Sequence, residues 1–350
     1  MALVQQVERA FAPGGVLARH WPEWEARPGQ RTLAIEVART LEHGGVLMAE
    51  APTGVGKSLA YLLPAVLHAA ETGERVVVAT CTRSLQDQLH ERDLPAVLTA
   101  LGVELPVSIL KGKQNYLCPR ALEMASGEGD SELAILESLR AWAARDPFGD
   151  LDRFEHADGE GFSRIRSRVA TDPSACTSAT CRRARECFWA RARRRAAEAK
   201  LVVVNHALLA RASGAEGLLP PFDVLVVDEA HRLEGVLSSQ LEKTASRHRV
   251  EELLRLTGSM AGGRRGTSLL ARVRTFALPL LDAAANRERL FAELERLSAR
   301  ADELRLDADA LFSRLAVSGA TGDGPYSRRV RHRDAAELFG RELQSLEVVL

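Results

Sequence analysis

The chain has 350 residues, of which 46% are hydrophobic and 27% are charged. This composition excludes a disordered or fibrous protein, and the length predicts two to three structural units. The 47 lysines and arginines balance 47 aspartates and glutamates, which excludes a uniformly basic surface but allows a local basic patch. No stretch has the roughly 18 uncharged apolar residues of a membrane helix, and the first residues lack the pattern of a secretory signal. We therefore expect a cytoplasmic protein without a membrane segment.

Short apolar segments alternate with helical patterns in the first third of the chain. Strands are expected at 45–50, 75–81 and 107–110, with helices at 58–70 and 84–94 between them. Two further strands are expected at 201–206 and 222–231. This alternation predicts an α/β fold in which a parallel sheet carries helices on its faces.

A glycine-rich segment, APTGVGKS at 51–58, follows an expected strand and opens an expected helix. Gly54 and Gly56 let backbone N–H groups turn inward on a phosphate, and the helix N-terminus adds a partial positive charge. Lys57 would reach the β and γ phosphates of ATP, and the Ser58 hydroxyl would hold Mg²⁺. The alternative is a strand-to-helix turn without a ligand, which this context disfavours.

The segment VLVVDEAH at 224–231 supplies the acidic residues that such a site requires. Asp228, at the end of a buried strand, would hold Mg²⁺, and Glu229 would orient and deprotonate an attacking water. His231 lies just beyond this acidic pair and is a further candidate catalytic residue, beside Lys57, Asp228 and Glu229. A carboxylate beside the metal-binding aspartate favours hydrolysis over a kinase reaction. A solvated acidic turn is the alternative, and the phosphate-binding segment disfavours it.

Residues 111–192 interrupt the alternation and have an uneven distribution of charge. Residues 121–160 carry a net charge of −8, and residues 163–200 carry a net charge of +8. The basic block suggests an anionic partner such as nucleic acid. The alternative is that these arginines lie on solvated helix faces.

Four of the five cysteines lie in the same region, at Cys118, Cys176, Cys181 and Cys187. Four thiolates can hold either a [4Fe-4S] cluster or Zn²⁺, and the spacing leaves both open beside a third alternative without metal. Cys81 is expected to be buried in its strand.

Phe188 and Trp189 follow Cys187 directly. They could stack on nucleic-acid bases, but packing against the metal site is favoured.

Beyond residue 232 the pattern is helical. An apolar seam with spacings of four and three residues predicts a helix that packs on a partner helix, through Leu290, Leu294, Leu297, Ala301, Leu304, Ala308 and Leu311. Loops are expected at 262–268 and 318–325, and a last helix at 335–350 runs to the end of the chain without a cap.

Together, these motifs resemble those of the iron-sulfur helicases of superfamily 2, the DinG and XPD group, over roughly residues 15–235. ARPGQ at 26–30 resembles the family's Q-motif, with Arg27 in the motif and Gln30 on the adenine. EAPTGVGKS at 50–58 resembles motif I, including Thr53 and Val55, although the family often has threonine in place of Val55. The remaining matches are VVVATCTRSLQDQL at 76–89 with motif Ia, which touches single-stranded DNA, KGKQNYLC at 111–118 with the start of the cluster segment, and DEAH at 228–231 with motif II.

The resemblance implies a P-loop NTPase with a RecA-like parallel sheet, built from residues 1–110 and 193–235. It implies an inserted iron-sulfur cluster domain at 111–192 that holds a [4Fe-4S] cluster through the four cysteines, and an all-helical Arch-like domain at 236–350. The implied activity is ATP- and Mg²⁺-dependent 5′-to-3′ translocation on single-stranded or forked DNA, with a role in DNA repair and the chain as a monomer.

Motif III and the second RecA-like domain would follow residue 350, so this chain alone is not expected to unwind DNA. Two alternatives stay open. One is a module that binds ATP and single-stranded DNA without translocating, and the other is a zinc-stabilised P-loop ATPase that acts on protein partners.

Overall fold

The computed structural model describes residues 2–319 except 22, 26, 128, 156, 158, 173–175, 177–179, 215–216, 242–246, 248–249, 252, 255–268, 278–279 and 282–283. The chain divides into two compact units, residues 1–242 and residues 243–350. The first unit contains the sheet, and the second is helical where it is described.

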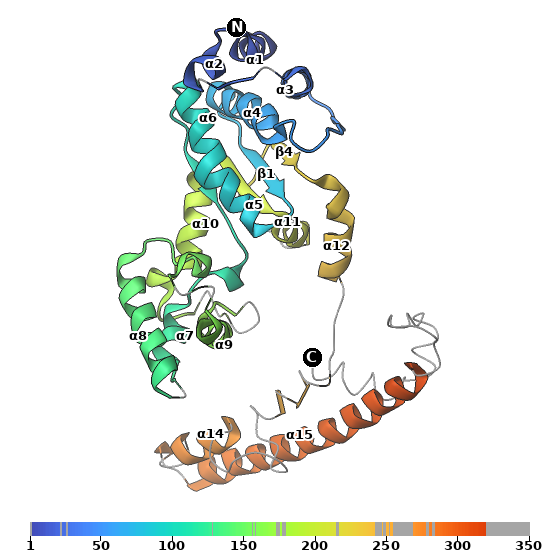
Figure 1. The fold of residues 1–350 in the computed structure, drawn as a ribbon. Helices are drawn as coiled ribbons and strands as arrows, with labels where there is room; N and C mark the ends of the chain where they lie inside the picture. The colour runs from blue at the N-terminus through green and yellow to red at the C-terminus, as the bar shows by residue number, and fades with distance from the viewer. Residues whose placement is uncertain are drawn as a thin grey trace. The chain divides into compact units, whose positions relative to one another are not determined.

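Four parallel strands form the sheet, in the order β2-β3-β1-β4 (Figure 1). They are β1 (Val76–Thr80), β2 (Val107–Ile109), β3 (Leu201–Asn205) and β4 (Val224–Val227). β1 and β3 are rich in β-branched residues and almost fully buried, as parallel strands covered on both faces are. The predicted α/β fold with a parallel sheet is confirmed.

The two faces of the sheet belong to two hydrophobic cores, because successive strand side chains point to opposite sides. Val76 and Val78 belong to a core shared with the N-terminal helices, whereas Val77 and Ala79 belong to a core shared with residues between β2 and β3. The helices of the first core are α1 (Leu3–Phe11), α2 (Val16–His20), α3 (Pro28–His43), α4 (Lys57–Thr72) and α6 (Leu94–Leu101). The single helix predicted at 84–94 is a longer helical run of α5 (Arg83–Gln88), a π-helical turn (Leu89–Asp93) and α6.

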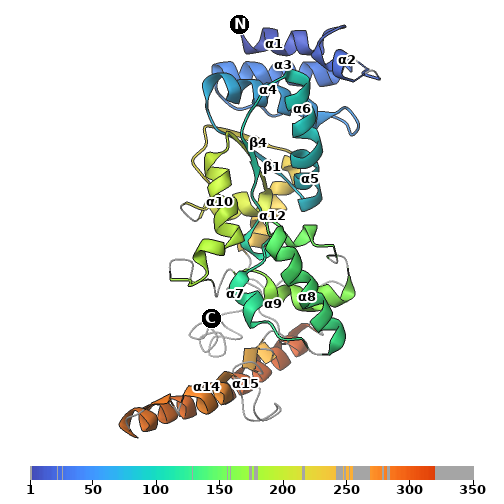
Figure 2. The ribbon, with the colours of Figure 1, turned by 90° about the vertical axis from the view of Figure 1, so that its left-hand side faces the viewer.

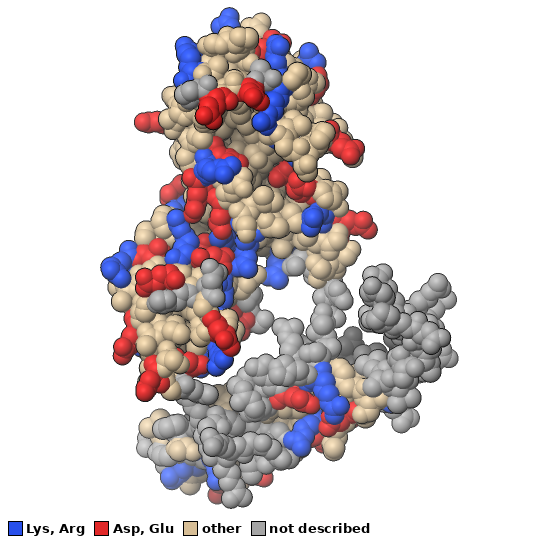
Figure 3. Space-filling view, in the orientation of Figure 1, with Lys and Arg blue, Asp and Glu red and all other residues tan. Residues whose placement is uncertain are grey.

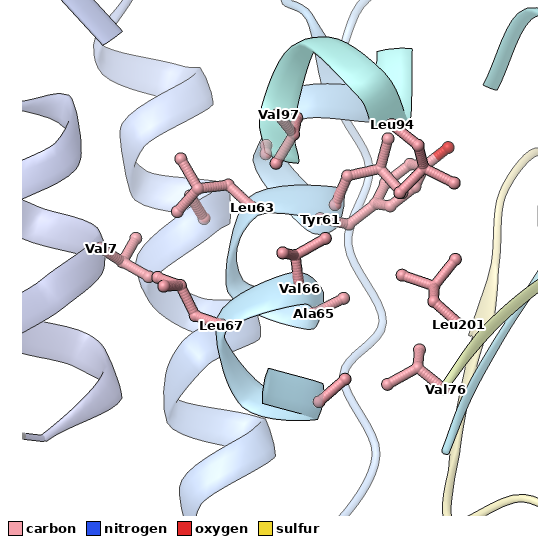
Figure 4. Close-up of a cluster of buried hydrophobic side chains, with 14 of the residues drawn as sticks. Val7, Tyr61, Leu63, Ala65, Val66, Leu67, Val76, Leu94, Val97 and Leu201 are labelled. Carbon is pink, nitrogen blue, oxygen red and sulfur yellow. The ribbon is translucent and has the colours of Figure 1, made fainter. Parts of the chain in front are cut away.

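Helix α4 lies at the centre of the first core. Every residue from Ala60 to Ala69 is buried, because helices and strands surround the helix. Figure 4 shows Leu63 and Leu67 directed toward Val7 of α1, while Ala65 and Val66 lie on the side of β1 and β3. This burial fixes the first turn of α4, which carries Lys57 and Ser58.

The chain between β2 and β3 builds the second core. Its helices are α7 (Pro119–Met124), α8 (Asp130–Arg145), α9 (Glu160–Val169) and α10 (Phe188–Glu198), with 3₁₀ turns at Lys113–Asn115, Leu151–Arg153 and Ala184–Glu186. Helices α7, α8 and α9 lie together (Figure 2). Gly149 has a φ of +67°, and a Cβ there would lie 2.1 Å from the Phe188 ring, so glycine is required at this close approach.

No strand forms at 45–50, where one was predicted. Val46 and Met48 are each 92% exposed, and Gly44 and Gly45 both have positive φ angles that turn the chain. A strand requires a neighbour that takes its backbone hydrogen bonds, and within the described residues none lies beside this segment. Its apolar composition therefore gave a wrong prediction of local structure.

After the sheet, α11 (His206–Ala212) follows β3, and a 3₁₀ turn (Ala230–Arg232) with α12 (Leu233–Leu241) follows β4. In the second unit the described helices are α14 (Leu269–Ala277) and the long α15 (Ala284–Gly319). The predicted apolar seam lies on α15, where Leu304 and Leu311 pack with Leu254, although Leu297 is 56% exposed. The loop predicted at 262–268, most of the loop at 318–325 and the helix at 335–350 lie outside the described residues.

Among the described helices, none combines the length and the apolar character that a membrane crossing requires.

Candidate functional site

Side chains from α3 and from the loop before it hold the glycine-rich loop. Arg27 Nη1 donates to the carbonyl oxygen of Gly54 at 2.5 Å, and Gln30 Nε2 donates to that of Gly56 at 2.8 Å. Gly54 and Gly56 have φ angles of +83° and +87°, and α4 begins at the next residue, Lys57. A Cβ at Gly56 would lie 2.1 Å from Gln30 Nε2, so this contact requires glycine.

These two contacts also orient the amide groups of the loop. In a trans peptide the N–H points opposite to the carbonyl, and the described chain has no cis bond. Arg27 and Gln30 donate to the carbonyl oxygens of Gly54 and Gly56, so these carbonyls point toward α3 and the loop before it. The N–H groups of the same two peptide units, those of Val55 and Lys57, therefore point away from α3. Two amide donors are thereby directed away from α3 at the start of a helix, the arrangement that binds phosphate. Thr53, in the same loop, is exposed.

Asp228 follows β4 and is fixed through its backbone and its side chain. Its N–H donates to the carbonyl of Ala79 at 2.8 Å, and its Oδ2 accepts from the Thr80 hydroxyl at 3.3 Å. His206 Nε2 lies 2.8 Å from the Asp228 carbonyl oxygen. A carbonyl only accepts, so Nε2 of this fully buried histidine carries the proton. Thr80 and His206 were not identified from the sequence, and the only signal for them is their place at the ends of β1 and β3.

Burial raises the pKa of the Asp228 carboxyl, and the neighbouring charge of Glu229 raises it further. The Thr80 hydroxyl and the charge of Lys57 act in the opposite direction without cancelling the shift. A carboxylate whose pKa is raised in this way is stabilised in its charged form by a nearby cation. This is the electrostatic property expected of a Mg²⁺ ligand.

Glu229 meets the lysine of the glycine-rich loop. Lys57 Nζ lies 3.5 Å from Glu229 Oε1, although 172 residues separate them in the chain. Glu229 has a φ angle of +54°, and among the described residues it is the only one other than glycine with a positive φ. Such strain persists only where the surroundings hold it, and it is frequent at active sites. His231 Nδ1 lies 3.5 Å from Glu229 Oε2, and its side chain is largely exposed.

Tyr61, one turn into α4, lies beside the metal-binding candidates. Its pKa is raised far above its ordinary value, first by burial and second by the charge of Asp228, while Ser58 acts in the opposite direction. Ser58 and Asp228 both interact with its buried hydroxyl. Oxygen-bearing side chains from α4 and from the end of β4 thus gather around one point, which fits a site for a hydrated Mg²⁺.

The four cysteines of the predicted metal site are not drawn together as closely as the residues of the candidate nucleotide site. The pKa of the Cys118 thiol is raised, first by burial and also by the charges of Cys187 and Cys181, so these three lie near one another. All four cysteines of the predicted site are half-buried and free of disulfides. Within the described part of the chain, however, no three histidine, cysteine or carboxylate side chains form a group that could hold a metal. Cys81 was expected inside a strand, but it follows β1 and is only half-buried, because the strand ends at Thr80.

The opposed charge blocks pair partly with each other. Ion pairs between the two blocks join Arg166 to Asp152 at 2.7 Å and Arg168 to Glu132 at 2.6 Å. Positive and negative side chains are interspersed on the visible face of the first unit (Figure 3). Part of the +8 charge is therefore neutralised internally, which weakens the expectation of a basic surface.

Phe188 and Trp189 are buried in the second core, with 4% and 5% of their surface exposed. Arg191 lies over the Phe188 ring, and Lys113 and Arg193 lie over the Trp189 ring, at centroid distances of 4.4, 4.5 and 5.0 Å. The rings are therefore packed in the protein core, and in this structure they do not present a face to a nucleic-acid base. Their packing against a metal site stays a prediction.

Comparison with known proteins agrees with the motifs. The family model described as DEAD/DEAH box helicase matches residues 31–125. The chain is 36% identical over 252 residues to the ATP-dependent DNA helicase YoaA of Escherichia coli K12, which covers 69% of this chain and 39% of that protein. It is 39% identical over 236 residues to the ATP-dependent helicase DinG of Mycobacterium tuberculosis H37Rv, which covers 61% of this chain and 35% of that protein.

The DinG helicase of Salmonella choleraesuis is 36% identical over 244 residues, which are 64% of this chain and 34% of that protein. The chain thus matches about two fifths or less of the length of these relatives. It carries a DEAD/DEAH box helicase domain and is homologous, through its N-terminal part, to the helicases DinG and YoaA.

Proposed function

We propose that this chain is the nucleotide-binding part of an ATP-dependent DNA helicase, which couples ATP hydrolysis to 5′-to-3′ movement along single-stranded DNA. The observation that carries the proposal is the approach of Lys57 on α4 to Glu229 after β4, beside Asp228. This brings a phosphate-binding loop and a metal-binding acidic pair to the same edge of a parallel sheet, where ligands of such sheets bind.

In the proposed mechanism, the N–H groups of Val55 and Lys57 and the ammonium group of Lys57 bind the phosphates of ATP. Ser58 and Asp228 would hold Mg²⁺, which supplies charge neutralisation at the phosphate oxygens when bound. Glu229 then exchanges its contact with Lys57 for a water molecule, which it orients for attack and deprotonates. Arg27 and Gln30 keep the loop in its binding conformation, and in the proposal Gln30 also contacts the adenine.

The remaining parts of the motor are proposed from the family resemblance. Residues 1–110 and 193–235 would be the first RecA-like domain, residues 111–192 an iron-sulfur insertion and residues 236–350 an Arch-like domain. The division of the chain into two compact units falls after residue 242, close to the start proposed for the Arch-like domain. Unwinding would need a second RecA-like domain. We also propose a cytoplasmic monomer that acts on single-stranded or forked DNA in repair.

The function is tested by measuring ATP hydrolysis by the purified chain with and without a single-stranded oligonucleotide. We expect slow, Mg²⁺-dependent hydrolysis, because the arginines that a second domain supplies to the transition state are worth about 10³- to 10⁵-fold. An extended chain that includes the second domain should hydrolyse ATP faster and respond to DNA. Binding of ATP and DNA without hydrolysis in the extended chain would instead support a non-translocating module.

For the metal site, we propose a [4Fe-4S] cluster on Cys118, Cys176, Cys181 and Cys187. Support comes from four thiols in one segment and from the effect of Cys187 and Cys181 on the pKa of the Cys118 thiol, which burial raises first. The described side chains do not by themselves form a metal-ligand group, so the cluster would have to draw the thiols together.

Replacing Cys118 with serine is expected to remove iron from the anaerobically purified protein, from about four atoms per chain to near zero, together with the brown absorption. The matched control is Cys81→Ser, which changes a half-buried cysteine outside the proposed ligand set and should leave the iron content unchanged. Zinc in place of iron in the unaltered protein would contradict the cluster and favour a zinc-stabilised ATPase.

A further inference from the structure

A polar pocket opens where β1 and β3 end, beside the residues that begin the β2–β3 segment. Its volume is ≈ 560 Å³, and its lining includes Arg83 of α5, Arg166 of α9, Gln114, Asn115 and Asn205. The two arginines can donate several hydrogen bonds each, and the three amide side chains can donate as well. This is the donor set that binds a phosphate group.

One carboxylate holds both arginines. Asp152 Oδ1 lies 2.7 Å from Arg166 Nη2, and both Asp152 oxygens lie 3.0 Å from Arg83 Nη1. The same Arg83 nitrogen donates to Asn115 Oδ1 at 3.0 Å. A guanidinium has five N–H donors, so these contacts fix the arginines without using all of their donors.

Asp152 is not required to neutralise Lys111, because two other aspartates lie closer to the Lys111 ammonium. Lys111 Nζ lies 2.7 Å from Asp87 and 2.7 Å from Asp150, but 3.6 Å from Asp152. With Arg83 and Arg166, this network contains three positive and three negative groups and is neutral. Removing the charge of Asp152 would therefore leave this network with a net charge of +1, while Lys111 keeps two close partners.

The resemblance of residues 76–89 to motif Ia already implies contact with single-stranded DNA at this pocket, because Arg83 lines it. We propose that Asp152, which lies outside that motif, is a positioning residue that sets how tightly a backbone phosphate of the strand is held. The inference rests on the proposed function for the identity of the strand. Asp152 keeps Arg83 and Arg166 at the pocket and competes with the phosphate for their N–H groups. A strand that moves past a site must be released repeatedly. A carboxylate that lowers the affinity of the two arginines for phosphate would make this release faster.

The test is the affinity of the chain for a fluorescently labelled oligonucleotide of twenty thymidines, measured by anisotropy over a range of salt concentrations. Asp152→Asn should tighten binding about three- to tenfold at low salt, because it adds one unit of positive charge to the pocket. The slope of log affinity against log salt should steepen by about 0.7. The control is Glu137→Gln on α8, which removes an exposed carboxylate that, unlike Asp152, does not pair with Arg83 or Arg166. It should change affinity less than twofold (roughly the limit for a screened surface charge).

A double variant, Arg83→Lys with Asp152→Asn, has the same net charge as Asp152→Asn but lacks the guanidinium of Arg83. It should lose most of the gain in affinity, which would assign the effect to the arginine and not to net charge. Equal affinities for Asp152→Asn and Glu137→Gln, or weaker binding by Asp152→Asn, would overturn the proposal.

A second measurement separates this inference from the proposed function. Inorganic phosphate should raise the unfolding temperature of Asp152→Asn more than that of Glu137→Gln, whether or not the chain hydrolyses ATP. Equal shifts would overturn the assignment of the pocket. If only free phosphate and no oligonucleotide is bound, the strand assignment fails.

Discussion

Replacing Lys57 with alanine is expected to lower ATP hydrolysis by about 10²- to 10³-fold, the usual loss when one preorganised charge donor is removed from a transition state. In the structure, the Lys57 ammonium lies 3.5 Å from the Glu229 carboxylate, so it is positioned to contact phosphates bound at the N-terminus of α4. The measurement is the steady-state release of phosphate at saturating Mg²⁺ and ATP. Iron content should stay unchanged, because Lys57 begins α4, which packs in the first core, whereas the cysteines of the proposed cluster lie in the β2–β3 segment.

The matched control for this variant is Lys200→Ala. Lys200 donates to the carbonyl of Gly73 where β1 and β3 begin, at the opposite end of these strands from Asp228. It removes one ammonium from the same unit without touching the candidate site, and hydrolysis should remain within about twofold. If Lys57→Ala and Lys200→Ala hydrolyse ATP equally, the phosphates are bound elsewhere and the proposed site is wrong.

The sheet could be predicted because its strands are buried on both faces and therefore stand out as apolar, β-branched segments. VVVAT at Val76–Thr80 and LVVVN at Leu201–Asn205 are of this kind, and their expected positions agree with β1 and β3. The segment at 45–50 is also mostly apolar, but an apolar sequence alone does not provide a hydrogen-bonding neighbour. Strand formation depends on tertiary partners, which local pattern does not encode.

The residues of the candidate nucleotide site were predictable where spacing reflects a mechanism. Lys57, Ser58, Asp228 and Glu229 stand out because a phosphate and a metal need those groups next to a strand end. Tyr61, Thr80 and His206 did not stand out, because a buried tyrosine, threonine or histidine is ordinary in sequence and gains its role only from contact with Asp228.

Charge gave the least reliable prediction. The blocks with net charges of −8 and +8 suggested a basic surface, yet arginines such as Arg166 and Arg168 pair with Asp152 and Glu132 of the acidic block. Net charge along a sequence does not determine which side chains meet after folding. The buried network around Lys111 is the clearest case, because nothing local distinguishes Lys111 from the nearby Lys113.

Replacing Lys111 with methionine is expected to lower the free energy of unfolding by about 3–5 kcal/mol, the usual cost of leaving a buried charge without its partner. The Lys111 side chain is fully buried, and that of Asp150 is only 8% exposed. Burial lowers the pKa of the Lys111 ammonium, but the charges and hydrogen bonds of Asp150 and Asp87 outweigh it and raise the pKa. The measurement is urea unfolding of the 350-residue chain at pH 7.

The control, Lys113→Met, removes a lysine two positions away that contacts the Trp189 ring at 4.5 Å, and it should cost only about 1 kcal/mol. Lys111→Arg keeps the charge, and it should recover part of the stability that Lys111→Met loses. A loss below about 1 kcal/mol in Lys111→Met would show that water reaches the network and that the ion pairs are screened.

The pH dependence separates lost charge from lost packing. Burial raises the pKa of Asp150 even with Lys111 present, and without the ammonium the pKa in the folded state must rise further. A carboxyl whose folded pKa exceeds its unfolded value destabilises the fold as the pH rises through the folded pKa, because it must ionise in a buried place. The difference between Lys111→Met and the unaltered chain should therefore shrink as the pH is lowered from 7 toward the unfolded pKa of aspartate. A difference that stays constant with pH would assign the loss to packing. The ion pairs of Lys111 with Asp87 and Asp150 would then contribute nothing to the free energy of unfolding.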